Sequence, residues 1–142
     1  MAYELETYRG AVYPWHCDTM GHMNTQFYAV IFDAAGFQFL SPVSRGLEAS
    51  NEKRGWADVK LSTEFKHEVR AGTLVHVRSS LTRIGTKSIE YRHSLLNSET
   101  GELHATCEAV TVRFDLNARK AVALEDAVRE RLKSWETNGK SP

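Results

Sequence analysis

Residues 26–40 constrain the fold of this chain more than any other feature of its sequence. The segment is apolar on nearly every side, and polar side chains interrupt it only at Gln26, Asp33 and Gln38. A helix that is hydrophobic all round must be enclosed by other elements. Asn24 or Thr25 can act as its N-cap, which accepts a hydrogen bond from an otherwise unpaired backbone N–H, and Ser41-Pro42 is expected to end it. The sequence therefore predicts a buried helix near the front of the chain.

Four later stretches alternate apolar and polar residues with a period of two, the pattern of half-buried strands. They lie at residues 59–67, 75–81, 89–95 and 103–114. Short turn signals at 71–72, 85–87 and 97–101 separate them, so the four strands are expected to form an antiparallel meander. In the last stretch the apolar alternation shifts by one residue, which predicts a β-bulge near Ala109.

The two ends of the chain complete the expected architecture. A short strand is expected at residues 8–13, and Leu124, Val128, Leu132 and Trp135 form the apolar stripe of a charged C-terminal helix. Because no repeat, low-complexity block or linker divides the chain, we expect one domain over residues 1–142. This order of elements predicts an α+β fold, in which a single curved sheet wraps around the long helix. Open sheet edges in such a fold favour dimerisation.

Charge and composition exclude several classes of function. Lys and Arg together number 18 and are balanced by 18 Asp and Glu, so we expect no partnership with nucleic acid or an anionic membrane. Residues 1–10 lack the apolar run of a signal peptide or membrane helix, which makes the cytoplasm the expected location. Cys17 and Cys107 are expected to be reduced thiols, and the six scattered histidines form no metal-binding motif. We therefore expect no metal.

Residues 15–24, Trp-His-Cys-Asp-Thr-Met-Gly-His-Met-Asn, join the first strand to the apolar helix and carry the candidate chemistry. Backbone N–H groups at a helix N-terminus point outward and can stabilise an oxyanion. Asp18 precedes those donors by a few residues, so a carbonyl polarised by the N–H groups of residues 24–26 can present its carbon to the carboxylate or to a water molecule. Considered alone, an aspartate before a helix is more often a structural cap.

The wider motif favours the catalytic interpretation. It consists of Cys17-Asp18-x-x-Gly21-His22-x-Asn24, then Tyr28, then Phe32-Asp33-Ala34-Ala35 on the helix. With this motif the sequence resembles the 4-hydroxybenzoyl-CoA thioesterase group of the hotdog superfamily. Further markers of the same resemblance are Gly72, Arg83-Ile84-Gly85-x-x-Ser88, Thr100-Gly101-Glu102, and Val110-Thr111-Val112 with Asp115. The resemblance extends from about residue 8 to the C-terminal helix.

The resemblance implies a hotdog fold, in which a five-stranded antiparallel sheet surrounds the long helix. It also implies homodimers or homotetramers with active sites at the subunit interface. The implied reaction is hydrolysis of an acyl-CoA with a small or medium acyl group, which can be aryl or cationic. No cofactor is implied, since coenzyme A is part of the substrate.

Residue by residue, the resemblance gives Asp18 the place of the catalytic carboxylate. That carboxylate acts as a nucleophile that forms a mixed anhydride or as a general base for water, and both roles stay open here. Asn24 and Thr25 complete the implied catalytic group. The chain departs from the family pattern where it has His16 in place of an acidic or small residue and Asn24-Thr25 in place of paired asparagines.

Six further residues are candidates for substrate binding: His22, Trp15, Trp56, Arg83, Lys87 and Ser88. The two tryptophans, with Tyr13, can wall an acyl pocket or form a cage for a quaternary ammonium, although ordinary packing is the commoner role. His22 can tune Asp18 or simply build the turn. Arg83 and Lys87 can contact the CoA phosphates or form part of a solvated rim.

Several residues are expected to be structural. Asp33 is expected in a buried or interfacial ion pair, His93 on an ordinary strand, and Cys107 in packing. Two other functions fit the same fold. One is a hydratase or dehydratase, whose usual Asn-Pro-x-His and His-Phe-Pro motifs the sequence lacks. The other is an acyl-CoA binding module without catalysis, which the intact motif at Asp18 disfavours.

Overall fold

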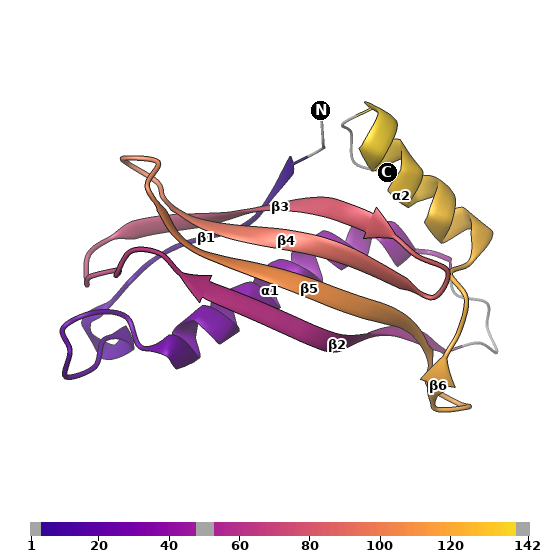
Figure 1. The fold of residues 1–142 in the computed structure, drawn as a ribbon, viewed down its shortest axis with the longest axis horizontal. Helices are drawn as coiled ribbons and strands as arrows, with labels where there is room; N and C mark the ends of the chain where they lie inside the picture. The colour runs from indigo at the N-terminus through magenta and orange to yellow at the C-terminus, as the bar shows by residue number, and fades with distance from the viewer. Residues whose placement is uncertain (1–3, 48–52, 139–142) are drawn as a thin grey trace.

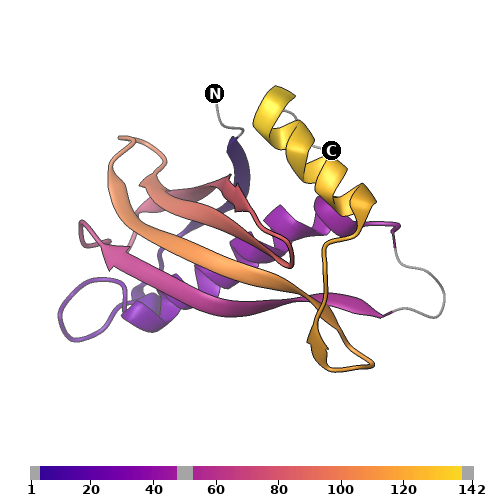
Figure 2. The same ribbon diagram turned by 45° about the vertical axis from the view of Figure 1, so that its right-hand side comes forward.

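The computed structural model describes residues 4–47 and 53–138. An antiparallel sheet curves around the long helix α1 (Thr25–Ser44), and a second helix, α2 (Asp126–Asn138), lies at one end of the molecule (Figures 1 and 2). The strands are β1 (Glu4–Ala11), β2 (Arg54–Phe65), β3 (Leu74–Ile84), β4 (Ser88–Asn97), β5 (Leu103–Asp115) and the short β6 (Lys120–Ala121). The predicted α+β architecture of a sheet wrapped around one helix is confirmed, with β6 as an addition to the five expected strands.

The predicted meander is wrong for β2. The strand order is β1-β3-β4-β5-β2, so β2 pairs with β5 at the edge of the sheet and only β3, β4 and β5 follow one another as neighbours. The expected turn at residues 71–72 instead belongs to a segment that crosses the end of the sheet. This segment is held by hydrogen bonds from Lys66 N to His104 O (2.8 Å) and from Val12 N to Thr73 O (2.9 Å). A turn signal marks a change of direction and carries no information about which strand comes next.

The predicted bulge near Ala109 is also wrong. Along β5 the inward positions stay in register from Ala105 to Arg113, and all of these alternate positions are buried. The irregularity lies instead on β2, where Val59 has no partner in β5 between the pairs Asp58–Thr111 and Lys60–Val110. The prediction failed because it placed Val110 and Val112 on the inner face of β5. The inner face instead carries Thr111 and the buried Arg113, and the two valines lie on the outer face.

Helix α1 begins as predicted and ends later. Asn24 is the N-cap, and its side chain accepts a hydrogen bond from Gln26 N (3.0 Å). The helix continues past Pro42 to Ser44, because the missing N–H of a proline in the last turn removes only one hydrogen bond. The helix is also not enclosed on every side in a single chain, since Val30 is 61% and Phe37 is 72% exposed.

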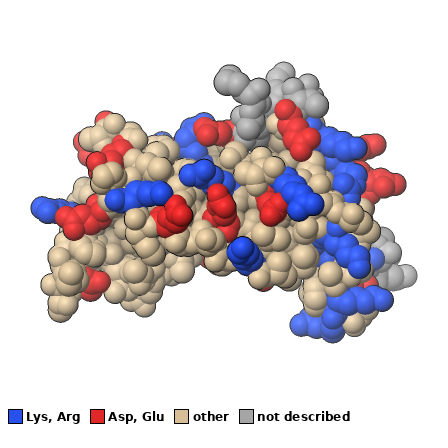
Figure 3. Space-filling model, viewed as in Figure 1, with Lys and Arg blue, Asp and Glu red and all other residues tan. Residues whose placement is uncertain are grey.

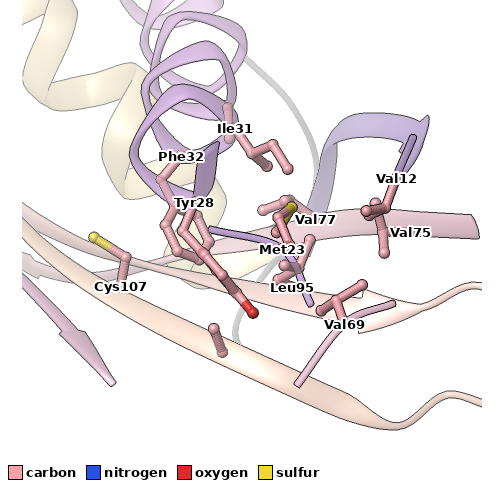
Figure 4. Packing of buried hydrophobic residues seen from close by; sticks show 12 residues of the cluster. Val12, Met23, Tyr28, Ile31, Phe32, Val69, Val75, Val77, Leu95 and Cys107 are labelled. Atoms are coloured by element: carbon pink, nitrogen blue, oxygen red, sulfur yellow. The ribbon is translucent and has the colours of Figure 1, made fainter. Parts of the chain in front are cut away.

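The core lies between α1 and the concave face of the sheet in two clusters. The first, shown in Figure 4, joins the first half of α1 to β3, β4 and β5, with Tyr28, Ile31 and Phe32 facing Val77 and Leu95. The second joins the end of α1 to α2. Its members include Phe39, Val43, Tyr91, Leu124, Val128, Leu132 and Trp135. The predicted apolar stripe of the C-terminal helix is therefore buried against the end of α1.

The outer surface carries mixed charge. Lys and Arg side chains alternate with Asp and Glu across the face of the sheet seen in Figure 3. This agrees with the balanced totals of the sequence. Within residues 4–47 and 53–138, no helix is long and apolar enough to cross a membrane.

Candidate active site

Asp18 lies in a tight loop between the short 3-10 helix Pro14–His16 and the N-terminus of α1. A β-bridge between Cys17 and Met23 closes the base of this loop, and Asp18 N donates to His22 O (3.2 Å). Gly21 sits at the tip with φ of +84°, a conformation that favours glycine. Met23 N donates to Val69 O (2.7 Å), which fixes the loop beside the segment that leaves the end of β2.

The Asp18 carboxylate is half-buried and held by two hydrogen-bond donors. Asn24 Nδ2 donates to Oδ2 (2.9 Å) and Met20 N donates to Oδ1 (2.9 Å). These bonds stabilise the ionised form, and with the Asn24 bond as the largest cause they lower the pKa of Asp18 below its usual value. Asp18 is therefore a carboxylate at neutral pH, as either catalytic role requires.

Asn24 connects this carboxylate to the helix, because the same side chain caps Gln26 N. Of the three backbone donors expected at this helix start, two are already used: Asn24 N donates to His16 O (2.9 Å) and Gln26 N to the cap. Within the described part of the chain the Thr25 N–H has no hydrogen-bond partner. Of these three donors at the start of α1, the Thr25 N–H is therefore the one left open.

The other predicted residues of this loop have different surroundings. Trp15 is 69% exposed and stacks on Tyr13 with ring centroids 4.6 Å apart. His22 is half-buried, with Nε2 3.9 Å from a carboxylate oxygen of Glu68. Trp15 thus lies on the surface of the Asp18 loop, and His22 ties this loop to the connection between β2 and β3.

A cavity of about 420 Å³ lies between the sheet and α1, whose lining residues run from Ala29 to Ser44. Its lining includes Phe32, Asp33, Gly36 and Phe37 from α1, Trp56, Asp58 and Leu61 from β2, Tyr91 and His93 from β4, and Cys107 and Arg113 from β5. Trp56, a candidate for the acyl pocket, lines this cavity. The sequence pattern gives no sign that Asp58, Tyr91 and Arg113 line it as well. His93 and Cys107, expected to be ordinary sheet and packing residues, are buried and also face the cavity.

Two paired arginines close the end of the cavity near α2. Arg113 is 1% exposed, donates from Nε and Nη2 to Glu125 (both 2.9 Å), and lies over the ring of Trp56 at 4.8 Å. Burial opposes ionisation of Glu125, yet the bonds from Arg113 hold its pKa below the usual value. Arg54 pairs with Asp115 at 2.7 Å. Both guanidinium groups thus have their own carboxylates.

A chain of buried polar side chains runs from the outer strand β1 to the cavity. Thr7 Oγ1 lies 2.7 Å from Ser79 Oγ, and Ser79 Oγ is hydrogen-bonded to His93 Nδ1. The His93 ring is stacked on Phe32 (centroids 5.7 Å apart). Burial lowers the pKa of His93 to about 4, so the imidazole is neutral at physiological pH.

A single chain does not bring the predicted site residues together. Asp18 precedes α1, whereas the residues of α1 that line the cavity run from Ala29 to Ser44, about 6 to 28 Å beyond Thr25 along the helix axis at ~1.5 Å per residue. Arg83, Lys87 and Ser88 lie at the turn between β3 and β4, which α2 contacts through hydrogen bonds from Arg129 Nη2 to Gly85 O (2.9 Å) and Thr86 O (3.2 Å). In that turn Arg83 pairs with Glu90 (3.6 Å) and Lys87 O accepts from Arg113 N (2.8 Å).

Among the described residues, no group of three His, Cys, Asp or Glu side chains is placed to hold a metal ion. Both cysteines are free thiols, Cys17 half-buried and Cys107 buried, and burial raises the pKa of Cys107.

Comparison with known proteins identifies related sequences. A betainyl-CoA thioesterase of Pseudomonas aeruginosa is 26% identical over 137 residues, which cover 94% of this chain and 85% of that protein. An L-carnitine dehydrogenase/betainyl-CoA thioesterase of Agrobacterium fabrum is 29% identical over 132 residues, which cover 92% of this chain but only 27% of that longer protein.

Solved structures share the fold. A 1,4-dihydroxy-2-naphthoyl-CoA thioesterase from Synechocystis superposes with a TM-score of 0.74 at 18% identity, over 94% of this chain and 96% of that one. A Staphylococcus aureus protein solved in complex with CoA gives a TM-score of 0.84 at 18% identity, over 100% and 89% of the two chains. The family model of the thioesterase-like superfamily matches residues 12–132. This chain therefore belongs to the thioesterase-like superfamily and is a thioester hydrolase with the hotdog fold.

Proposed function

We propose that this enzyme hydrolyses acyl-CoA thioesters and that Asp18 is its catalytic carboxylate. The observation that carries the proposal is the ionised Asp18, held by Asn24 and Met20 next to the open N–H of Thr25. A thioester oxygen that accepts from this N–H gains negative charge as its carbon is attacked, and the helix N-terminus stabilises that charge.

Two routes then lead to the same products. In one, the Asp18 carboxylate attacks the carbonyl carbon, CoA leaves as the thiolate, and water hydrolyses the resulting anhydride. In the other, Asp18 takes a proton from a water molecule that attacks the carbonyl carbon directly. Both routes need the ionised form of Asp18, which its lowered pKa provides.

The relatives suggest the substrate. The structural neighbour solved with CoA supports coenzyme A as the thiol part. Two relatives are named for betainyl-CoA, whose acyl group carries a trimethylammonium charge. A cationic acyl group is therefore the candidate for the acyl part of the substrate of this chain. The location in the cytoplasm remains a prediction from the sequence.

We further propose that the active form is a homodimer. β2 is a long edge strand paired only with β5, and its exposed side chains include Leu61 at 60% and Phe65. The exposed side chains Val30 and Phe37 of α1 form a second apolar area. Exposed edges and apolar faces of this kind are typical of subunit interfaces. A homotetramer built from two such dimers is the larger assembly that the sequence allows.

Pairing through β2 would also complete the site. When two β2 edges pair antiparallel about a twofold axis, the end of one strand lies beside the start of the other. The Asp18 loop leads into α1, whose first turn contacts the end of β2 through Tyr28 and Phe65 (centroids 4.9 Å apart), and Met23 N of the loop donates to Val69 O just after β2 (2.7 Å). The cavity is lined along β2 from Arg54 to Thr63 and so includes the start of that strand, with Trp56 and Asp58. Dimerisation would therefore bring Asp18 of one copy toward the cavity of the other.

The test of the proposed function is the substitution Asp18→Asn. It preserves size and removes the negative charge, so a folded variant should still bind acyl-CoA while kcat falls by at least ~10²-fold. Steady-state hydrolysis across a series of acyl-CoAs, together with calorimetric binding, measures both quantities. Asp126→Asn, an exposed acid at the start of α2, is the matched control and should leave turnover unchanged.

Two results would contradict the assignment. A folded Asp18→Asn enzyme that turns over its best substrate at the wild-type rate would remove Asp18 from the chemistry. Wild-type protein that binds acyl-CoAs tightly and hydrolyses none would favour the alternative of a binding module without catalysis.

A further inference from the structure

The cavity between α1 and β2 has an excess of negative charge. Its two arginines are each paired with a carboxylate, Arg113 with Glu125 and Arg54 with Asp115. Its two aspartates, Asp33 and Asp58, form no ion pair or hydrogen bond with any described residue. When the Glu125 and Asp115 carboxylates that pair with the two arginines are included, the charges around the cavity add up to a net charge of −2, which comes from Asp33 and Asp58.

Tyr91 adds a buried polar group that is directed at the same space. Its ring is 3% exposed, and within the described residues its hydroxyl has no hydrogen-bond partner. The hydroxyl lies 3.5 Å from the position that a Cβ on Gly36 would take, so the glycine leaves it open toward the cavity. Burial and the nearby charges of Asp58 and Asp33 raise the pKa of Tyr91, which keeps the phenol neutral and able to accept or donate.

The remaining walls are apolar and aromatic. Phe32, Phe37, Leu40 and Leu61 line the cavity together with the ring of Trp56. Two carboxylates among such walls are a poor site for a hydrated metal ion, because too few oxygen ligands converge. They are a good site for an organic cation whose charge is spread over methyl groups, since aromatic faces and carboxylates both attract it.

We propose that Asp58 and Asp33 are the residues that select the acyl group, by requiring that it carry a permanent positive charge. Tyr91 and Trp56 provide the aromatic surface against which the alkylated ammonium packs. The proposal rests on the proposed acyl-CoA hydrolysis and adds which residues determine specificity. Neither aspartate takes part in bond making, which remains with Asp18.

Isosteric substrates test this selection without changing shape. Trimethylammonioacetyl-CoA and 3,3-dimethylbutanoyl-CoA differ only by a quaternary nitrogen in place of a quaternary carbon. Wild-type enzyme should prefer the cation in kcat/KM. Asp58→Asn and Asp33→Asn should each lower that preference about tenfold, and the double variant by about a hundredfold if the two contributions add. The rate on the neutral isostere should stay within about twofold.

The matched control is Glu64→Gln. It removes a negative charge from the same strand at an exposed position, where Glu64 pairs with Lys66 and does not line the cavity. This variant should keep the full preference for the cation. Equal rates of wild-type enzyme on the two isosteres, or equal losses on both in the aspartate variants, would overturn the proposal.

A binding experiment separates this proposal from the proposed function. Trimethylammonioacetate and 3,3-dimethylbutanoate are the free acids of the two substrates, and their binding can be followed by calorimetry. If the protein hydrolyses no acyl-CoA but binds the cationic acid better, and loses this difference in Asp58→Asn, the specificity proposal stands and the hydrolytic one fails. If hydrolysis is observed but binding does not discriminate between the acids or the thioesters, the specificity proposal fails alone.

Discussion

His93 shows how one buried residue can carry the acid sensitivity of the whole protein. It is 2% exposed, bonded to Ser79 and packed on Phe32, and its pKa is lowered to about 4. In the unfolded chain a histidine titrates near 6.5, so between about pH 6.5 and pH 4 the unfolded state binds more protons. Stability should therefore fall as the pH falls through this window.

We predict that His93→Gln, which keeps a hydrogen-bonding side chain and cannot titrate, flattens this dependence. Full loss of the His93 contribution amounts to roughly 3 kcal/mol in the wild type. Urea unfolding of both proteins at about pH 7 and about pH 5 measures the difference, while lowered-pKa carboxylates such as Asp18 and Asp115 titrate alike in both. An identical pH dependence in the two proteins would show that His93 is not buried in its neutral form.

At the residue scale, the sequence predicts contacts between residues that are close along the chain, but not contacts that depend on which strands are neighbours in the sheet. Asn24 as the cap and Asp18 beside the helix start follow from a few neighbouring positions, which the sequence presents in order. Asp58 and Tyr91 belong to the cavity because two strands and a helix meet there. Such a meeting depends on strand order, which turn signals do not encode.

At the scale of the element, α1 carries a glycine where helix propensity alone would favour another residue. Gly36 is buried in mid-helix, at a cost of about 1 kcal/mol relative to alanine. A Cβ there would make ordinary contacts with Tyr91 Oη at 3.5 Å and His93 Nε2 at 4.0 Å, so the space would accept it. Packing within the chain therefore does not require the glycine, and the space beside Tyr91 is left open to the cavity.

We predict that Gly36→Ala stabilises the fold by up to about 1 kcal/mol and lowers kcat/KM for bulky acyl groups more than for acetyl-CoA. The added methyl group strengthens the helix and fills the notch beside Tyr91. Melting temperature and a series of acyl groups of increasing size measure the two effects. Ala34→Gly, on the side of α1 away from the cavity lining, is the control and should lower stability without changing the acyl preference. If Gly36→Ala raises the melting temperature but leaves the dependence of kcat/KM on acyl size unchanged, the space beside Gly36 is not part of the acyl-binding site.

At the scale of the whole molecule, Asp18 precedes the start of α1 and the cavity extends along this helix to its other end, and the proposed dimer joins Asp18 of one copy to the cavity of the other. This arrangement can be tested with mixed dimers in which each of the two chains carries a different inactivating substitution. Asp18→Asn removes the carboxylate, and Gly36→Phe places a ring in the cavity. In a mixed dimer one site would combine the intact Asp18 of one chain with the open cavity of the other, whereas the second site would lack both.

We predict that each variant alone is inactive and that coexpression of the two restores about a quarter of the wild-type activity, the share expected when half of the dimers are mixed and each has one intact site. Activity of the unfractionated coexpressed protein provides the check, and mixed dimers isolated through two different tags should have about half of the wild-type activity per dimer. Leu61→Trp can replace Gly36→Phe should the latter fail to fold, since Leu61 lines the same cavity from β2. Two inactive parents with no restored activity would place the complete site within one chain.

The position of β2 also has a consequence for how the chain is made. Its partners in β5 follow 40 to 61 residues later, whereas β3, β4 and β5 are consecutive hairpin neighbours. A nascent chain leaving the ribosome therefore presents α1 and β2 well before β5 exists, and the local meander can form first. Closing the sheet with β2 is the long-range step, which is slow when loop closure must precede contact. The apolar face of α1 packs on β3, β4 and β5, so on the growing chain it stays uncovered until those later strands have been made.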